Sequence, residues 1–198
     1  MTDIDTTNED YLLDEVWTLY FHDPHDPCWK TESYVRLADI SSARDYASVA
    51  HVIEEKIIHG MFFVMREQVY PCWDDKYNID GGCVSMKVSK RDAKRFWDET
   101  CKRMLSESLY LPRGMSGEDH CSSGASSASV ANINGLSISS KPLHSIVKLW
   151  MSKEAAQNPT EVVQSLNLPE GVIGEVMFRS NRELIGSSQT RAQYSTTT

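Results

Sequence analysis

The sequence contains no apolar run that approaches the roughly 20 residues needed to cross a bilayer, and residues 1–10 are polar and acidic rather than signal-like. Hydrophobic residues make up 40% of the 198 residues and charged residues 24%, which is an ordinary composition for a globular protein. This length suits one compact domain with a single core. We therefore expect a cytoplasmic protein, with the nucleus as a second location.

Paired cysteines are also missing. The five cysteines are an odd number, and no two of them form a CxxC pair, which argues against a disulfide framework and against a zinc ribbon. Metal-capable side chains do occur between His22 and Cys28, but two Asp-Pro steps there favour a turn over a preorganised ligand cage. We expect free thiols, a plain loop in this segment, and neither a metal nor another cofactor.

Positive charge is scarce, because the formal net charge is -8 at pH 7. A general nucleic-acid binder uses a broad basic surface to displace counterions from phosphates. If this chain binds RNA, it must recognise something small and chemically unusual. The sequence also lacks a P-loop, a nucleophile elbow and any Cys-His or Ser-His spacing that would support catalysis. These absences predict a binding protein rather than an enzyme.

Strand-like and helix-like segments alternate along the chain. Runs of aliphatic and aromatic residues predict strands at 16–21, 33–38, 61–65, 83–88, 143–151 and 172–179. Apolar residues at helical spacing predict helices from Ser41 or Ser42 to Gly60, from a capping box at Ser89 to Leu105, and over 152–165. This order predicts an α+β fold, in which one antiparallel sheet carries helices on one face and leaves the other for a ligand.

The domain boundaries follow from composition. We expect a flexible arm at 1–12, one domain at 13–186, and a disordered tail at 187–198 that is rich in Ser, Thr and Gln. Inside the domain, the Ser- and Gly-rich stretch 114–131 predicts a loose loop.

Two of the five tryptophans lie where a core residue is not expected. Trp17 and Trp97 fit periodic apolar patterns, whereas Trp29 and Trp73 fall in predicted loops with polar neighbours. One interpretation is that each loop tryptophan covers an edge of the core. The other is that the two rings stack on a ligand. Asp74 directly follows Trp73, and a carboxylate beside stacked rings would complement a cationic base such as N7-methylated guanine.

Several motifs, in order, resemble those of the eukaryotic translation initiation factor 4E family between about Leu13 and Phe178. They are Val16-Trp-Thr-Leu-Tyr-Phe21, Trp29, Tyr70-Pro-Cys-Trp-Asp-Asp75, Asp80-Gly-Gly82, Arg95-Phe-Trp-Asp-Glu-Thr100 and Trp150. The resemblance implies a curved antiparallel sheet with three long helices on its convex face. It also implies a site for the 7-methylguanosine cap of messenger RNA on the concave face.

The resemblance assigns a role to each residue of that site. Trp29 and Trp73 match the two tryptophans that stack on the base, and Trp150 matches the tryptophan that contacts the N7 methyl group. Asp74 stands at the position of a family glutamate that binds the guanine edge, one methylene shorter. Asp75 is an alternative for this role.

The phosphate-binding residues depart from the family pattern. The positions of two family basic residues hold Cys83 and Ile146 here. Strand alternation puts Lys148 on the same face as Trp150, and Lys141 aligns with a family arginine. We expect Lys148 and Lys141 to contact the phosphates. The other basic candidates near the C-terminus are Arg179 and Arg182.

The surface that binds partner proteins in the family is also altered. Family members bind a Tyr-x-x-x-x-Leu-Φ helix of the scaffold factor 4G through a tryptophan on the first helix, a position held by Ala47 here. Asp98 and Lys102 replace two apolar residues of the second helix, whereas Glu99 is retained. We expect weak binding of a standard 4G helix and a modified mode for a 4G-like scaffold, with Tyr11 and Leu12 as further contacts. Such remodelling resembles the divergent paralogues of kinetoplastid protozoa.

Three functional hypotheses follow from the resemblance. The chain is a cap-binding initiation factor that works through a 4G-like scaffold, or a cap-binding repressor or adaptor that does not engage a standard 4G. A third hypothesis is a degenerate member that serves only as a protein-interaction module, but the retained Trp29, Trp73, Asp74 and Trp150 argue against it.

Overall fold

The computed structural model of the 198-residue chain describes residues 11–110 and 133–195, with side chains described as far as 188. The predicted loop at 114–131 lies outside the described residues. So do residues 1–10 of the predicted arm and the last three residues of the predicted tail.

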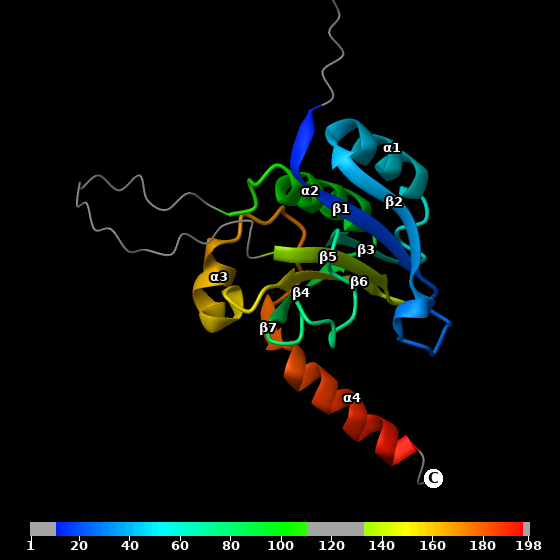
Figure 1. The fold of residues 1–198 in the computed structure, drawn as a ribbon, viewed down its shortest axis with the longest axis vertical. Helices are drawn as coiled ribbons and strands as arrows, with labels where there is room; N and C mark the ends of the chain where they lie inside the picture. Colours follow the sequence, from blue (N-terminus) through cyan, green and yellow to red (C-terminus); the bar gives the residue numbers. More distant parts are fainter. Residues whose placement is uncertain (1–10, 111–132, 196–198) are drawn as a thin grey trace, which may run out of the picture.

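The framework is one seven-stranded antiparallel sheet in the order β2-β1-β3-β5-β6-β4-β7 (Figure 1). Its strands are β1 (Leu12–His22), β2 (Val35–Ser42), β3 (Met61–Arg66), β4 (Gly82–Ser89), β5 (Ile133–Ser140), β6 (His144–Met151) and β7 (Met177–Ser180). Every strand contains β-branched, aliphatic or aromatic residues that suit a pleated, half-buried surface. The predicted α+β sheet is confirmed.

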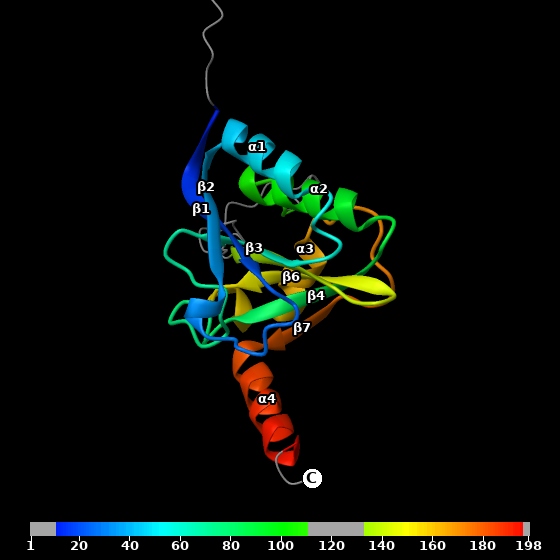
Figure 2. The same ribbon diagram turned by 90° about the vertical axis from the view of Figure 1, so that its right-hand side faces the viewer.

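Two helices, α1 (Ala43–Ile53) and α2 (Ala93–Leu105), lie side by side over one face of the sheet, as Figures 1 and 2 both show. The hydroxyl of Ser42 accepts a hydrogen bond from the backbone N–H of Asp45 and so caps α1. Before α2, the backbone N–H of Asp92 donates to the Ser89 hydroxyl at 3.0 Å, and that hydroxyl donates to the Asp92 carboxylate at 2.6 Å. Both predicted helix starts are therefore anchored by local side chains.

The main core lies between these helices and the sheet. Alternate strand residues such as Leu19, Val84 and Leu149 meet Phe96 and Trp97 of α2 there, and all five are at most 3% exposed. A fully buried aromatic or aliphatic side chain contributes about 1.5–3 kcal/mol. Packing against this core thus fixes which face of the sheet α1 and α2 cover.

Two predicted helices differ from the structure. The first ends at Ile53 rather than Gly60, and 54–59 form hydrogen-bonded turns that still bury Ile57. The third helix, α3 (Pro159–Ser165), has only seven residues, whereas a long helix was expected. Proline lacks a backbone N–H and is best tolerated in the first turn of a helix, so α3 begins at Pro159 instead of near residue 152.

The predicted disordered tail is wrong for residues 187–195, which belong to a fourth helix, α4 (Asn181–Ser195). Figures 1 and 2 show α4 projecting away from the sheet. Its first residue is fully buried, and the Asn181 side-chain amide donates to the carbonyl of Asn78 at 2.7 Å. This anchor comes from a distant loop, so local composition gave no sign of it. Among the described residues, no helix has the length and apolar character needed to span a membrane.

The face of the sheet that α1 and α2 do not cover is named the open face here. It carries a second cluster of buried side chains, named the open-face cluster: Tyr20, Phe63, Met65, Val69, Cys83 and Trp150. These residues come from β1, β3, β4, β6 and the chain just after β3. The chain therefore buries aromatic residues on both faces of one sheet.

We predict that Gly81→Ala destabilises the fold. A methyl group at this position would overlap the backbone carbonyl oxygen of Met151, which the β4–β6 ladder holds in place. Overpacking of this kind costs about 1–3 kcal/mol, so urea unfolding followed by tryptophan fluorescence should show a lower midpoint.

Gly186→Ala in α4 is the matched control, because a methyl group there meets nothing within 4 Å. This variant should unfold at the wild-type urea concentration or above it, since alanine favours helix over glycine. A Gly81→Ala midpoint equal to that of Gly186→Ala would contradict the prediction.

Candidate functional site

The two loop tryptophans approach the open face on neighbouring loops. Trp29 lies in the β1–β2 connection, and Trp73 lies in the β3–β4 connection and packs against the open-face cluster. The loops touch, because the Cys72 thiol lies 4.0 Å from the backbone carbonyl oxygen of Trp29. The structure therefore brings together the two loops that carry these tryptophans, which are 44 positions apart in the sequence.

Trp29 presents one covered face and one open face. Its indole stacks on the imidazole of His22 with ring centroids 4.2 Å apart and an interplanar angle of 5°. Trp29 is nevertheless 52% exposed. A large apolar ring that is half exposed in a loop contributes little to a core and is available to a ligand.

His22 is held firmly beneath that ring. It is fully buried, its Nε2 lies 2.8 Å from the carbonyl oxygen of Cys28, and Tyr34 packs against it at a tilt. A carbonyl only accepts hydrogen bonds, so Nε2 must carry the proton. The sequence interpretation of His22 as part of a plain loop missed this contact, which depends on how the loop folds back on β1.

Trp73 is half buried and faces a cation. The ammonium of Lys148 lies 5.2 Å from the centroid of the Trp73 ring, within the range of cation–π attraction. The prediction that Lys148 and Trp150 share a face is confirmed, because Val147 and Leu149 lie in the main core whereas Trp150 lies in the open-face cluster. The Trp73 ring thus already contacts a positive group within the protein.

The two candidate carboxylates differ in their contacts. Asp75 accepts a hydrogen bond from the backbone N–H of Tyr77 at 2.9 Å and so stabilises its own loop. Asp74 is exposed. The pKa of the Tyr34 phenol is raised chiefly by burial, then by the neighbouring Cys72, and further by the negative charge of Asp74. Asp74 therefore lies near the meeting point of both tryptophan loops.

Trp150 forms part of the floor of this region. It is 3% exposed, its indole N–H donates to the Ser137 hydroxyl at 2.9 Å, and its ring meets Phe63 edge-on. A contact with an N7 methyl group stays a prediction for this residue.

Basic side chains converge beside the floor. Burial lowers the pKa of Lys148, and the nearby positive charges of Lys141 and Arg179 lower it further. Arg179 on β7 pairs in register with Cys83 on β4, so both side chains lie on the same face of the sheet. Arg182, by contrast, is engaged by the carboxylate of Asp80. Among the described residues, Lys148 forms no ion pair with an acidic side chain.

The altered partner surface lies behind the sheet, over α1 and α2. Ala47 is exposed on α1. Asp98 accepts hydrogen bonds from the Tyr46 hydroxyl at 3.0 Å and from the Lys102 ammonium at 2.7 Å. Glu99 pairs with Arg95 at 3.2 Å. The charged substitutions on α2 are therefore satisfied within the helix pair rather than left open for a partner.

The structure places Tyr11 and Leu12 beside this surface. Both are about three-quarters exposed, at 75% and 77%. The carbonyl oxygen of Tyr11 accepts a hydrogen bond from the backbone N–H of Ala43, the first residue of α1, at 2.8 Å. The two exposed apolar side chains thus extend the α1 surface.

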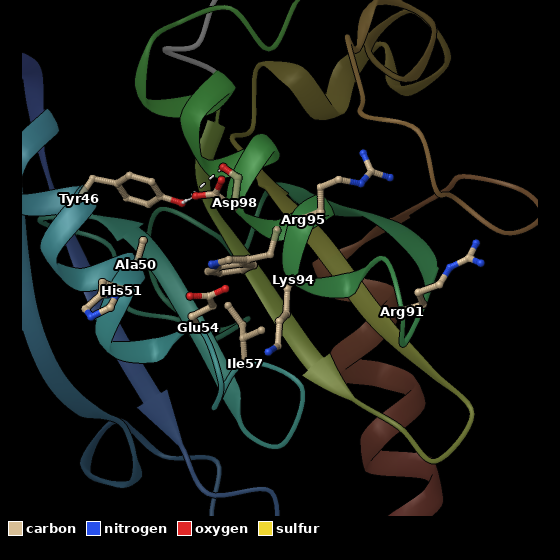
Figure 3. A pocket seen from close by; sticks show the side chains of 10 residues that line it. Tyr46, Ala50, His51, Glu54, Ile57, Arg91, Lys94, Arg95 and Asp98 are labelled. Carbon is tan, nitrogen blue, oxygen red and sulfur yellow. Dashed lines mark hydrogen bonds between the residues drawn. The ribbon is translucent and has the colours of Figure 1, made fainter.

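A hollow of about 570 Å³ opens between α1 and α2 (Figure 3). Its lining includes Tyr46, Ala50, Glu54, Ile57, Lys94, Trp97 and Asp98. Figure 3 shows Arg91 and Arg95 extending away from α1 at its rim. This hollow contains neither Trp29 nor Trp73 and lies on the opposite side of the sheet, so it is a region separate from the two tryptophan loops.

Comparison with known proteins identifies the family and supports the fold. A sequence model of the eukaryotic initiation factor 4E family matches residues 12–194. C. elegans eIF4E-3, in a complex with the 4E-binding protein Mextli, has a TM-score of 0.67 and 14% identity, with 88% of this chain and 96% of that chain covered. A second C. elegans eIF4E-3 structure, with Mextli and a cap analog, has a TM-score of 0.65 and 14% identity, with 90% of this chain and 96% of that chain covered.

A schistosome eIF4E complexed with m7GpppA and 4E-BP has a TM-score of 0.61 and 18% identity, with 78% of this chain and 79% of that chain covered. At these identities the solved structures support the fold, while the sequence match covers nearly all of the described chain. The chain belongs to the eukaryotic initiation factor 4E family of cap-binding translation factors.

Proposed function

We propose that this chain binds the 7-methylguanosine cap of messenger RNA by stacking the methylated base between Trp29 and Trp73. The observation that carries the proposal is the contact between their two loops on the open face, through Cys72 and the Trp29 carbonyl. The half-exposed Trp29 ring offers a free face. The schistosome relative was solved with m7GpppA and one C. elegans relative with a cap analog, which supports the same ligand class here.

The expected binding energies indicate that the two rings alone do not provide micromolar affinity. Stacking contributes about 1–3 kcal/mol per base, and the positive charge of the methylated base adds about 0.5–2 kcal/mol over a Trp face. A hydrogen bond to Asp74 adds about 1.5–3 kcal/mol. Micromolar affinity requires about 8 kcal/mol net of association costs. Phosphate contacts must supply a remainder, and we assign them to Lys148, Lys141 and Arg179.

Trp73→Ala should weaken binding of 7-methyl-GTP by roughly tenfold to 100-fold, because one stacking face is lost. Isothermal titration calorimetry of wild type and variant measures this, with unmethylated GTP as the ligand control. Tyr11→Ala, which removes an exposed aromatic ring on the other side of the sheet, should bind normally. Equal affinity of wild type for both nucleotides would contradict the proposed function.

Asp74→Asn and Asp75→Asn form a matched pair in the same titration. Asp74→Asn should lower the affinity for 7-methyl-GTP by about tenfold, since an amide replaces a charged acceptor. Asp75→Asn should have a smaller effect, because this side chain bonds to its own loop. The reverse order would transfer the guanine-edge role to Asp75.

Lys148→Met should lower the affinity for 7-methyl-GTP by about tenfold. The affinity for 7-methylguanosine, which lacks phosphates, should be nearly unchanged. Removal of a half-buried cation beside Lys141 and Arg179 relieves repulsion, so the variant should remain folded. Arg179→Gln should behave in the same way. Arg182→Gln is the control, because Arg182 is already paired with Asp80. Equal losses for both ligands would show that Lys148 does not act on the phosphates.

The partner side leaves two candidate functions. The C. elegans and schistosome relatives were each solved with a 4E-binding protein. Both candidate functions accordingly involve a protein partner. We propose that a 4G-like scaffold engages α1 and α2 in a modified mode, or that a repressor or adaptor takes its place. The specific observations are the exposed Ala47 and the internally paired Asp98, which remove an apolar anchor from the surface.

A standard Tyr-x-x-x-x-Leu-Φ peptide should bind the wild-type chain at least about tenfold more weakly than it binds an ordinary family member, because a buried aromatic anchor is worth about 2 kcal/mol or more. Ala47→Trp should recover part of this affinity in a fluorescence polarisation titration. Ala50→Trp is the matched control, because it adds the same ring one turn away and fills the hollow. Wild-type affinity equal to that of an ordinary family member would refute the expectation.

In this proposal the chain is a binding protein rather than an enzyme. We place its action in the cytoplasm, where messages are translated, with the nucleus as a second location.

A further inference from the structure

We propose that His22 is a positioning residue for Trp29, and that the bound state is a three-layer stack of base, Trp29 and His22. This inference rests on the proposed function, because it concerns how the same site is prepared for its ligand. Nothing in the sequence pattern marked His22 for this role. Three observations on the contacts of the imidazole carry the argument.

The first observation is the stack itself. The two rings are nearly parallel, at 5°, with centroids 4.2 Å apart. One face of the indole is therefore occupied by the protein, and the exposed fraction of 52% belongs to the remaining surface. A ring that is supported on one face and open on the other is prepared to accept a single flat ligand.

The second observation is that one side chain restrains both the ring and the backbone of Trp29. The Nε2–H of His22 donates to the carbonyl of Cys28, the residue directly before Trp29, at 2.8 Å. Stacking limits rotation of the indole, while the hydrogen bond limits movement of the loop. Restraint of a binding group before the ligand arrives lowers the entropy cost of association.

The third observation separates His22 from an ordinary core residue. Its Nδ1 is buried and has no hydrogen-bond partner among the described residues. An unpaired buried polar atom is unfavourable for folding, so an apolar ring would serve better if only packing mattered. Nε2, which ties down the loop, is the useful polar atom of this side chain.

Aromatic contacts connect this support to the floor of the site. The ring centroids of Tyr34 and His22 lie 4.9 Å apart, and Phe63 meets Tyr34 edge-on with ring centroids 5.4 Å apart. The ring centroids of Trp150 and Phe63 lie 6.3 Å apart. The imidazole is thus the last member of a packed series of rings that runs from β6 to the loop, and Trp29 rests on its end.

Three substitutions at His22 separate stacking from the hydrogen bond. His22→Phe keeps a flat ring without the Nε2 donor, His22→Gln keeps an N–H donor without a ring, and His22→Ala removes both. With the full chain and 7-methyl-GTP, His22→Ala should weaken binding by about fivefold to tenfold, the size expected when one side chain must be ordered on binding. His22→Phe should recover part of this loss through stacking, and His22→Gln a smaller part through its N–H donor. His25→Ala, at an exposed histidine of the same loop, should bind like wild type.

A double-mutant cycle shows whether His22 acts through Trp29. In a Trp29→Ala background, His22→Ala should cause less than about a twofold further loss, because there is no ring left to position. A general folding defect would instead reduce affinity equally in both backgrounds, and thermal melting of each variant reports such a defect directly. A full loss in the Trp29→Ala background therefore overturns the proposal, as does wild-type binding by His22→Ala.

Failure of the inference and failure of the proposed function give different results. If wild type binds 7-methyl-GTP no better than GTP, the proposed function fails and the inference falls with it. A different result overturns only the inference. In that case wild type prefers 7-methyl-GTP over GTP and Trp29→Ala loses affinity, but all His22 variants bind normally. His22→Phe that is as weak as His22→Ala would also overturn it, since stacking would then not be the operative contact.

Discussion

Successive side chains along a β-strand point to opposite sides, so every strand of this sheet must satisfy two different surroundings at once. On β6, Val147 and Leu149 enter the main core beneath the helices, while Lys148 and Trp150 point to the open face. On β4 and β7, the register that buries Val84 and Phe178 also sets Cys83 opposite Arg179. The helices, the aromatic floor and the basic group all depend on this alternation, because a slip of one residue would exchange the two faces.

The open face reconciles an acidic chain with an anionic ligand. A net charge of -8 provides no general attraction for RNA. Lys148, Lys141 and Arg179 are instead gathered in one place, where burial and mutual repulsion already lower the pKa of Lys148. A phosphate chain would relieve that repulsion. Local concentration of a few cations beside stacking rings favours a short charged ligand over a long nucleic acid.

The two faces of the sheet carry different kinds of side chain. The open face carries Trp29 and Trp73 on touching loops, with Lys148, Lys141 and Arg179 near one another beside them. The helix side carries polar residues that bond to one another, as Asp98 does with Tyr46 and Lys102. The sheet separates these two surfaces, so a change of partner on α1 and α2 need not disturb the contacts around Trp29 and Trp73.

The sequence by itself determined the features that depend on near neighbours. Apolar periodicity predicted α2 and segments that overlap every strand except β5. The Ser89–Asp92 pair predicted a helix start, and Trp73-Asp74 indicated a candidate ligand-binding loop. Only the tertiary structure decided the support of Trp29 by His22, the placement of Arg179 opposite Cys83, and the start of α4 at Asn181. Each of these is a contact between segments whose approach is set by strand register and loop closure. Register and closure depend on the packing of the whole sheet, and a local pattern of residues does not encode them.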